Sequence, residues 1–176
     1  DALGVHGIAR YLAARGLGEL KTKEVAPVAG SFARQISVTI DDDTLEQAPV
    51  FYGRVIQGVR NGPSPQWLQD RLRAIGLRPI SILVDITNYF TFDQNRPLHV
   101  FDADKVAGHA LRVHRAKGGE AFHALDEKTY TLEPDMTAIS DANGVESLAG
   151  VMGGQHSGCT DETVNVFVEA AYFDPI

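Results

Sequence analysis

The chain has 176 residues, of which 44% are hydrophobic and 22% are charged, and its formal net charge is −7. This length predicts one folded domain with a buried core, and the sequence contains no apolar run of about eighteen residues that would predict a membrane span. Nucleic-acid binders usually carry a basic surface, because neutralising phosphates supplies most of their affinity. The acidic balance argues against a free-standing nucleic-acid binder, and another domain or subunit would have to supply most of the affinity for RNA.

Cys159 is the single cysteine, which excludes an internal disulfide framework and a cysteine-based metal cluster. The chain does not open on a signal peptide, and both features favour a cytoplasmic protein. It begins within an apolar-periodic segment and ends at Asp174-Pro175, a pair typical of the start of a helix. We therefore expect an excised piece of a larger protein, truncated at its C-terminus.

The first predicted element is a helix over residues 5–15, where apolar residues recur at helical spacing and Gly16 occupies the position of a C-cap glycine. Residues 18–30 have no clear period and contain Pro27, which indicates a linker. We assign residues 1–34 to the end of a helical domain plus this linker, and residues 35–176 to the main domain.

The main domain opens on a predicted half-buried strand, because Ile36, Val38 and Ile40 alternate with polar residues. Residues 41–43 are three consecutive aspartates, whose side chains point in different directions; a solvated turn is favoured over a metal site. A second strand is predicted over residues 51–59.

A helix start is predicted at Ser64-Pro65, with Ser64 as the N-cap and Pro65 as the first helical residue. Gly76 is predicted to end this helix. The residues predicted to form its buried stripe are Leu68, Leu72 and Ile75.

The next helix is predicted from the apolar spacing within residues 82–90, and it carries Thr87 and Asn88. Both residue types are poor choices inside a helix, so their presence indicates a polar duty, with a solvent-facing pair as the alternative. A turn is expected at residues 93–97, followed by His99 in an apolar and aromatic setting. Residues 84–102 together are a candidate wall for a pocket that holds a small substrate with a polar end.

From residue 110 the pattern becomes strand-rich, with strands predicted over 111–115, 121–125, 129–132 and 164–171. Asn143-Gly144 is a strong hairpin signal, and residues 147–154 are predicted to end a strand in a glycine loop. Because strands, hairpins and isolated helices follow one another without regular βαβ alternation, the fold class predicted is α+β, layered, with mostly antiparallel sheets and a few helices.

Glu169 lies within the apolar run of residues 164–171. Alternation favours a solvent-facing carboxylate, because Val166 and Val168 would occupy the other side of its strand. The alternative is a buried carboxylate, which would need a donor such as an arginine, a backbone N–H or a ligand hydroxyl.

The remaining chemical motifs are weak. The loop with Gly150 and Gly153 fits neither phosphate-binding glycine spacing, although its glycines would let the backbone approach a ligand. The histidines show no zinc-site spacing, so no metal is expected. Ser157 and Cys159 lack a nucleophile setting, and a lone histidine such as His99 is commonly a hydrogen-bonded core residue.

Seven segments together resemble the β subunit of bacterial phenylalanyl-tRNA synthetase, and they occur in that family's order across nearly the whole chain. They are GIARYLA (7–13), SPQWL (64–68), RLRAIGLRPI (71–80), VDITNY (84–89), PLHVFD (97–102), AGVMGG (149–154) and VEAAYFDP (168–175).

The resemblance implies the central editing module of that subunit, a layered α+β sandwich that hydrolyses tyrosine mischarged onto the phenylalanine tRNA. It also implies an α subunit as partner in a heterotetramer. ATP and magnesium belong to ligation by the whole enzyme, and no cofactor is expected in this module. The family continues past Ile176 into a helix and a Thr-x-Ala segment that closes the pocket.

Carried over residue by residue, the resemblance implies catalytic roles for Thr87, Asn88 and His99 and amino-acid binding by Gly150 and Gly153. It implies that Glu169 reads the tyrosine hydroxyl, with a bulge or strand end turning this carboxylate inward.

The chain departs from the family pattern at Val100, where Ala is common, and at Asn95-Arg96-Pro97, where Gly-Gln-Pro is common. The alternative function is a non-catalytic structural or RNA- or protein-docking module with a vestigial pocket.

Overall fold

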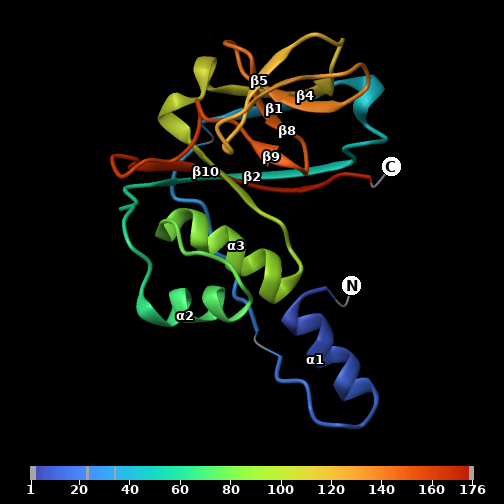
Figure 1. Cartoon of the computed structure of the whole chain (residues 1–176), viewed down its shortest axis with the longest axis vertical. Coiled ribbons are helices and arrows are strands. Elements are labelled where there is room, and N and C mark those ends of the chain that lie inside the picture. Colours follow the sequence, from blue (N-terminus) through green and yellow to red (C-terminus); the bar gives the residue numbers. More distant parts are fainter. Residues whose placement is uncertain (1–2, 23, 34, 175–176) are drawn as a thin grey trace.

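The computed structural model describes residues 3–22, 24–33 and 35–174, and these form three layers (Figure 1). The middle layer is a three-stranded antiparallel sheet in the order β2 (Val50–Gln57), β10 (Asn165–Tyr172), β3 (His99–Asp102). Helices α2 (Gln66–Ala74) and α3 (Ile82–Gln94) cover one face of this sheet, and a larger sheet covers the other. The predicted layered α+β fold is confirmed.

The larger sheet has five strands and is antiparallel except for its first pair, β1 and β4, which is parallel. A separate two-stranded ribbon, β5 and β6, lies above it. The strands in sheet order are β1 (Ser37–Ile40), β4 (Ala110–Arg115), β7 (Thr137–Ser140), β8 (Val145–Leu148) and β9 (Met152–Gly153), and the ribbon consists of β5 (Ala121–His123) and β6 (Thr129–Thr131).

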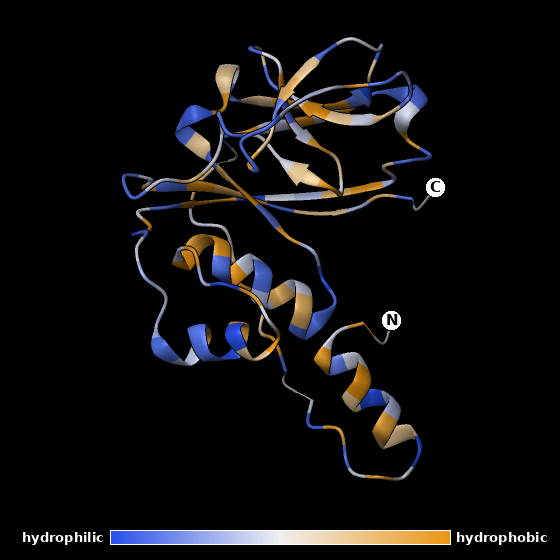
Figure 2. Ribbon diagram, viewed as in Figure 1, coloured by the Kyte–Doolittle hydropathy of each residue, from blue (hydrophilic) through white to orange (hydrophobic). Residues whose placement is uncertain are grey.

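Two hydrophobic clusters hold these layers together. The first lies between the two large sheets, around Phe101, Val113, Ile139 and Phe167, each at most 2% exposed. The second lies between the five-stranded sheet and the ribbon, around Phe122. Figure 2 shows hydrophobic residues along β2 and β10, whereas α2 is largely hydrophilic. The middle sheet is covered most fully along β10, whereas most residues of β2 are exposed.

Most predicted strands are confirmed to within two residues. The Asn143-Gly144 turn joins β7 to β8, and the N–H of Asp141 donates to the carbonyl of Gly144 at 3.0 Å. The predicted glycine loop is shorter than expected, because β9 resumes at Met152 and leaves residues 149–151 as the turn. Three short 3₁₀ turns cover residues 42–44, 103–105 and 107–109.

The start of α2 differs from the prediction. Pro65 is the N-cap residue, and the side chain of Ser64 does not cap the helix. The Ser64 hydroxyl instead donates to Oδ2 of Asp85 at 2.5 Å, and the N–H of Ile80 donates to Oδ1 at 2.9 Å. Asp85 is fully buried on α3, so it joins both helices and the segment between them. A tertiary contact has replaced the local cap.

The buried stripe of α2 is also narrower than predicted. Leu68 and Leu72 are each 1% exposed, but Ile75 is 47% exposed. Ile75 is the C-cap residue, where the chain leaves the helical path. Gly76 follows with φ +85°, and the N–H of Leu77 donates to the carbonyl of Leu72 at 2.9 Å, so the predicted glycine end is confirmed.

Helix α1 (Val5–Ala14) agrees with the first predicted element and contacts α3. Gly16 has φ +73°, and the N–H of Leu17 donates to the carbonyl of Leu12 at 3.1 Å, which is a Schellman ending. The described residues between 19 and 36 contain no helix or strand, as predicted for a linker. The boundary at residues 34 and 35 stays a prediction, and Pro175 and Ile176 lie outside the described residues.

None of the helices within the described ranges is long and apolar enough to cross a membrane.

Replacing Asp85 by alanine is expected to lower the free energy of unfolding by about 3 kcal/mol, because it leaves the buried Ser64 hydroxyl and Ile80 N–H without an acceptor. Asp85→Asn keeps an oxygen for the N–H and should recover most of the loss. Urea unfolding of both variants, with the exposed Asp70→Ala as matched control, measures the effect. Equal stability of Asp85→Ala and the control would contradict it.

Candidate functional site

His99 and Glu169 lie side by side on neighbouring strands of the middle sheet. Strands β3 and β10 pair antiparallel with His99 opposite Glu169 and Val100 opposite Val168. Directly opposed residues of an antiparallel pair project from the same face of the sheet. That face is the one toward the five-stranded sheet, because Phe101 and Phe167 share it and belong to the core cluster between the two sheets.

A cavity of about 490 Å³ opens at this end of the two sheets. It contains four of the six predicted site residues: His99, Gly150, Gly153 and Glu169. The complete lining is Asn95, Arg96, Pro97, Leu98, His99, Ser147, Gly150, Val151, Met152, Gly153, Glu169, Ala171, Tyr172 and Phe173.

Glu169 is buried, with 5% of its surface exposed, so the solvent-facing expectation from strand alternation is wrong. The pairing of β10 is continuous through Glu169, and no bulge turns the side chain inward. Alternation fails here because the face of β10 that carries Glu169 also carries Phe167, which is buried in the core between the two sheets.

The Glu169 carboxyl group lacks a full set of hydrogen-bond partners. Its Oε2 atom is buried and accepts no hydrogen bond from any described residue. Burial away from water raises the pKa of Glu169 to about 7. A buried polar atom without a partner is costly, and because Glu169 also lines the cavity, a ligand hydroxyl that reached this oxygen would satisfy it.

The His99 imidazole lies edge-on to Phe101, with ring centroids 4.4 Å apart. The side chain keeps part of its surface open to the cavity, but the surrounding protein still removes enough water to lower the pKa of His99 to about 4. His99 is therefore neutral at pH 7. A neutral imidazole has one nitrogen that accepts a hydrogen bond, for example from water.

The glycine loop makes room for the site. A Cβ atom on Gly153 would lie 2.2 Å from Cε1 and 2.6 Å from Nε2 of His99, so no larger residue fits beside the ring in this position. Gly150 has φ +70°, and a Cβ atom there would lie 3.0 Å from the ring of Phe173. The sequence predicted that these glycines let the backbone approach a ligand, which stays a prediction; the groups that lie against them in the structure are the side chains of His99 and Phe173.

Thr87 and Asn88 are not brought into this cavity. Both lie on α3, which covers the opposite face of the middle sheet (Figure 1). The Thr87 hydroxyl donates to the carbonyl of Val84, one helical turn earlier, at 2.7 Å. Because this hydroxyl is used within its own helix, the geometry gives it no contact with the His99 cavity.

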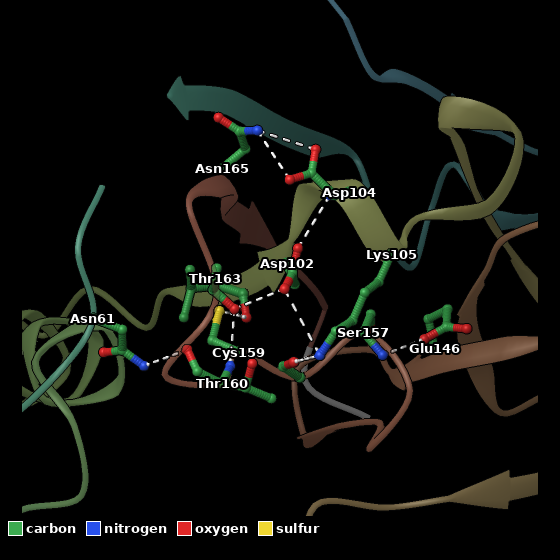
Figure 3. A network of polar contacts seen from close by, with 12 residues as sticks. Asn61, Asp102, Asp104, Lys105, Glu146, Ser157, Cys159, Thr160, Thr163 and Asn165 are labelled. Atoms are coloured by element: carbon green, nitrogen blue, oxygen red, sulfur yellow. Dashed lines mark hydrogen bonds and ion pairs between the residues drawn. The ribbon is translucent and has the colours of Figure 1, made fainter. Parts of the chain in front are cut away.

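A polar network centred on Asp102 holds the segment that leads into β10 (Figure 3). Oδ2 of Asp102 accepts a hydrogen bond from the Thr163 hydroxyl at 2.6 Å, and the N–H of Asp102 donates to the carbonyl of Ser157 at 2.8 Å. Lys105 donates to the carbonyl of Gly158 at 2.7 Å. Asp102 and His99 are the two ends of β3, so these contacts help to fix the register that sets His99 opposite Glu169.

Asp141, Glu146 and His156 form a group that sequence analysis did not single out, because the three are dispersed along the chain. One ligand-type atom from each lies within 4.8 Å of the others. Protein groups already engage the buried Glu146: Oε1 lies 2.8 Å from Nδ1 of His156, and Oε2 accepts from the N–H of Ser157 at 3.1 Å. The group therefore has an internal structural role.

Cys159 is unsuited to nucleophilic catalysis. Burial away from water raises the pKa of its thiol to about 11, so the thiolate is scarce at neutral pH. This agrees with the expectation that Cys159 has no nucleophile setting.

A family model described as the B3/4 domain matches residues 47–176. Two curated relatives are phenylalanine–tRNA ligase β subunits: the one from Ruegeria pomeroyi is 69% identical over 176 residues, and the one from Cereibacter sphaeroides is 62% identical over 177 residues. Both alignments cover 100% of the chain but only 22% of the relative, so the chain spans about a fifth of the relatives' length.

A solved structure shares the fold. It is the crystal structure of an N-terminal fragment of the phenylalanyl-tRNA synthetase β subunit from Pyrococcus horikoshii, with a TM-score of 0.63 and 17% sequence identity. The match covers 96% of this chain and 51% of that one.

Glu169 and His99, both in the cavity wall, should give opposite pH dependences of stability. Between pH 4.5 and about 7 the folded chain keeps a proton on Glu169 that the unfolded chain has lost. The contribution of Glu169 to the free energy of unfolding therefore falls as pH rises. Between about pH 4 and 6.5 His99 is protonated in the unfolded chain but not in the folded chain. The contribution of His99 to the free energy of unfolding therefore rises with pH.

Urea unfolding from pH 5 to 7 should therefore show a steeper rise of stability with pH in Glu169→Gln than in the parent chain. In His99→Gln the free energy of unfolding should instead rise less steeply with pH than in the parent chain. Each full transition is worth up to about 3 kcal/mol. Parallel pH profiles for all three proteins would show that neither pKa is displaced by folding.

Proposed function

The chain belongs to the B3/4 domain family, and we propose that it is the part of a phenylalanine–tRNA ligase β subunit that hydrolyses the ester of tyrosine wrongly attached to tRNA. The whole ligase would join phenylalanine to its tRNA with ATP and magnesium, together with an α subunit. Ester hydrolysis consumes only water, so this proposal requires no cofactor in the cavity.

The observation that carries this proposal is the buried carboxyl group of Glu169 in the cavity wall, whose Oε2 atom has no hydrogen-bond partner among the described residues. A tyrosine hydroxyl would satisfy it, whereas phenylalanine would leave it unpaired at a cost of about 1–3 kcal/mol. A pocket built for phenylalanine cannot strongly reject an analogue that only adds a hydroxyl, so a second site that reads this hydroxyl is useful. The cavity volume is in the range of small-molecule sites.

His99 is proposed to act on the water that attacks the ester. Its neutral ring can accept a hydrogen bond from that water and hold it beside the carbonyl. With a pKa of about 4, the imidazole is a weak base at pH 7, which favours orientation of the water over removal of its proton. Thr87 and Asn88 lie outside the cavity, so the chemistry is assigned to His99 and the specificity to Glu169.

The alternative is a non-catalytic docking module whose cavity is a remnant. It offers no account of why a carboxyl group with an unpaired oxygen is kept in the wall of an open cavity, beside a histidine for which Gly153 makes space. The two functions differ in what they predict for substitutions inside the cavity.

Glu169→Ala is expected to slow hydrolysis of tyrosyl-tRNA by about tenfold or more, with little effect on phenylalanyl-tRNA, because only tyrosine uses the carboxyl group. The measurement is single-turnover hydrolysis of both esters by the assembled ligase, with the exposed Glu133→Ala as matched control. Equal slowing of both esters would contradict the recognition role of Glu169.

His99→Ala is expected to reduce the hydrolysis rate of both esters by about a hundredfold, within the range for a positioned catalytic group. Gly153→Ala should act in the same direction, because its new Cβ would displace the His99 ring. Phenylalanine ligation in the same preparations serves as the folding control. Unchanged hydrolysis in both variants would support the docking alternative.

A further inference from the structure

The cavity lining changes in character from its closed end to its mouth. Glu169 and Ser147 are 5% and 4% exposed, whereas Val151 is 70% exposed and Arg96 is also an exposed lining residue. An amino acid whose hydroxyl reached Glu169 would therefore have its ester end toward the mouth. Whatever the ester is attached to would lie outside, next to the exposed lining residues.

Arg96 is the permanent cation of the lining. Within the described residues no carboxylate lies within ion-pair distance of its guanidinium, whereas Arg112 pairs with Asp41 and Arg115 with Asp135. The one carboxyl group of the lining, Glu169, is buried at the other end. Among the described lining residues, Arg96 is thus the charged side chain at the mouth, on a chain with a formal net charge of −7.

The backbone that carries Arg96 is fixed at the end of α3. Asn95 is the helix C-cap with φ +52°, and the N–H of Arg96 donates to the carbonyl of Phe90 at 3.3 Å. Pro97 follows and restricts the next backbone angle. The Arg96 side chain therefore starts from a backbone position that is defined on both sides.

We propose that Arg96 binds a phosphodiester of the nucleic acid that carries the ester, at the mouth of the cavity. This inference rests on the proposed function and adds the anchor for the substrate's nucleic-acid end. An arginine presents donors that match two phosphate oxygens, and a single contact of this kind adds affinity without reading sequence. Because the contact is the same before and during hydrolysis, it should lower KM and leave kcat unchanged.

The test uses the assembled ligase and three tyrosyl esters: one on adenosine, with no phosphate; one on a dinucleotide, with one phosphodiester; and one on whole tRNA. Arg96→Gln should raise KM for the dinucleotide ester about fivefold to tenfold at low salt. The same substitution should also make the slope of log(kcat/KM) against the logarithm of the salt concentration shallower by about 0.7. The adenosine ester should be unaffected, and Arg96→Lys should restore most of the loss.

Arg78→Gln is the matched control, because Arg78 is exposed and lies outside the cavity lining. If Arg96→Gln slowed hydrolysis of the adenosine ester as much as that of the dinucleotide ester, Arg96 would act by shaping the cavity, and the phosphate contact would be overturned. The same result for Arg96→Gln and Arg78→Gln on the dinucleotide would also overturn it.

If the parent enzyme hydrolyses none of the three esters, the proposed function fails. The phosphate contact is then tested by measuring how tightly each variant binds a single-stranded RNA trinucleotide. Weaker binding by Arg96→Gln than by Arg78→Gln supports the contact, and equal binding overturns it.

Discussion

The pairing of β10 between β2 and β3 is the constraint on which the site depends. Hydrogen bonds to two neighbours fix the register of β10, and the core cluster around Phe101 and Phe167 fixes which face turns toward the second sheet. A shift of one residue would send Glu169 to the helical face and bring Val168 or Ala170 into the cavity. The polar network at Asp102 holds the strand at its other end and opposes such a shift.

The same enclosure sets the electrostatics of the cavity. Removal of water moves the pKa of Glu169 up to about 7 and that of His99 down to about 4, so at pH 7 His99 is neutral and Glu169 is about half protonated. Their proximity therefore involves little charge–charge attraction, and neither satisfies the other with a hydrogen bond. A cavity with an available acceptor at its closed end and a neutral imidazole nearer the mouth suits a ligand with a hydroxyl at one end and an ester at the other.

Local signals in the sequence predicted the elements well, and tertiary contacts account for the differences. Gly16, Gly76 and Asn143-Gly144 each demand a particular backbone geometry, and each ends or turns its element as predicted. The sequence predicts Ser64 as a helix cap, but its hydroxyl donates a hydrogen bond to Asp85, twenty-one residues later in the chain. Glu169 reads as solvent-facing because alternation shows the period of a strand but not whether its second face is covered.

The candidate site was predictable only in part, for the same reason. The family resemblance singled out six residues, and four of them line one cavity. Thr87 and Asn88 lie near His99 in sequence, but β3 turns His99 toward the sheet layer while α3 stays in the helical layer. Two features require coordinates, since neither leaves a pattern along the chain: the steric reason for Gly153, and the lack of an ion-pair partner for Arg96 among the described residues.

A crystal structure with a non-hydrolysable tyrosyl ester analogue tests the central claim most directly. The account predicts the phenolic oxygen within about 3 Å of Oε2 of Glu169, a typical hydrogen-bond distance, and the ester carbonyl on the His99 side of the cavity. An analogue bound with its ring toward the mouth, or away from Glu169 altogether, would contradict it.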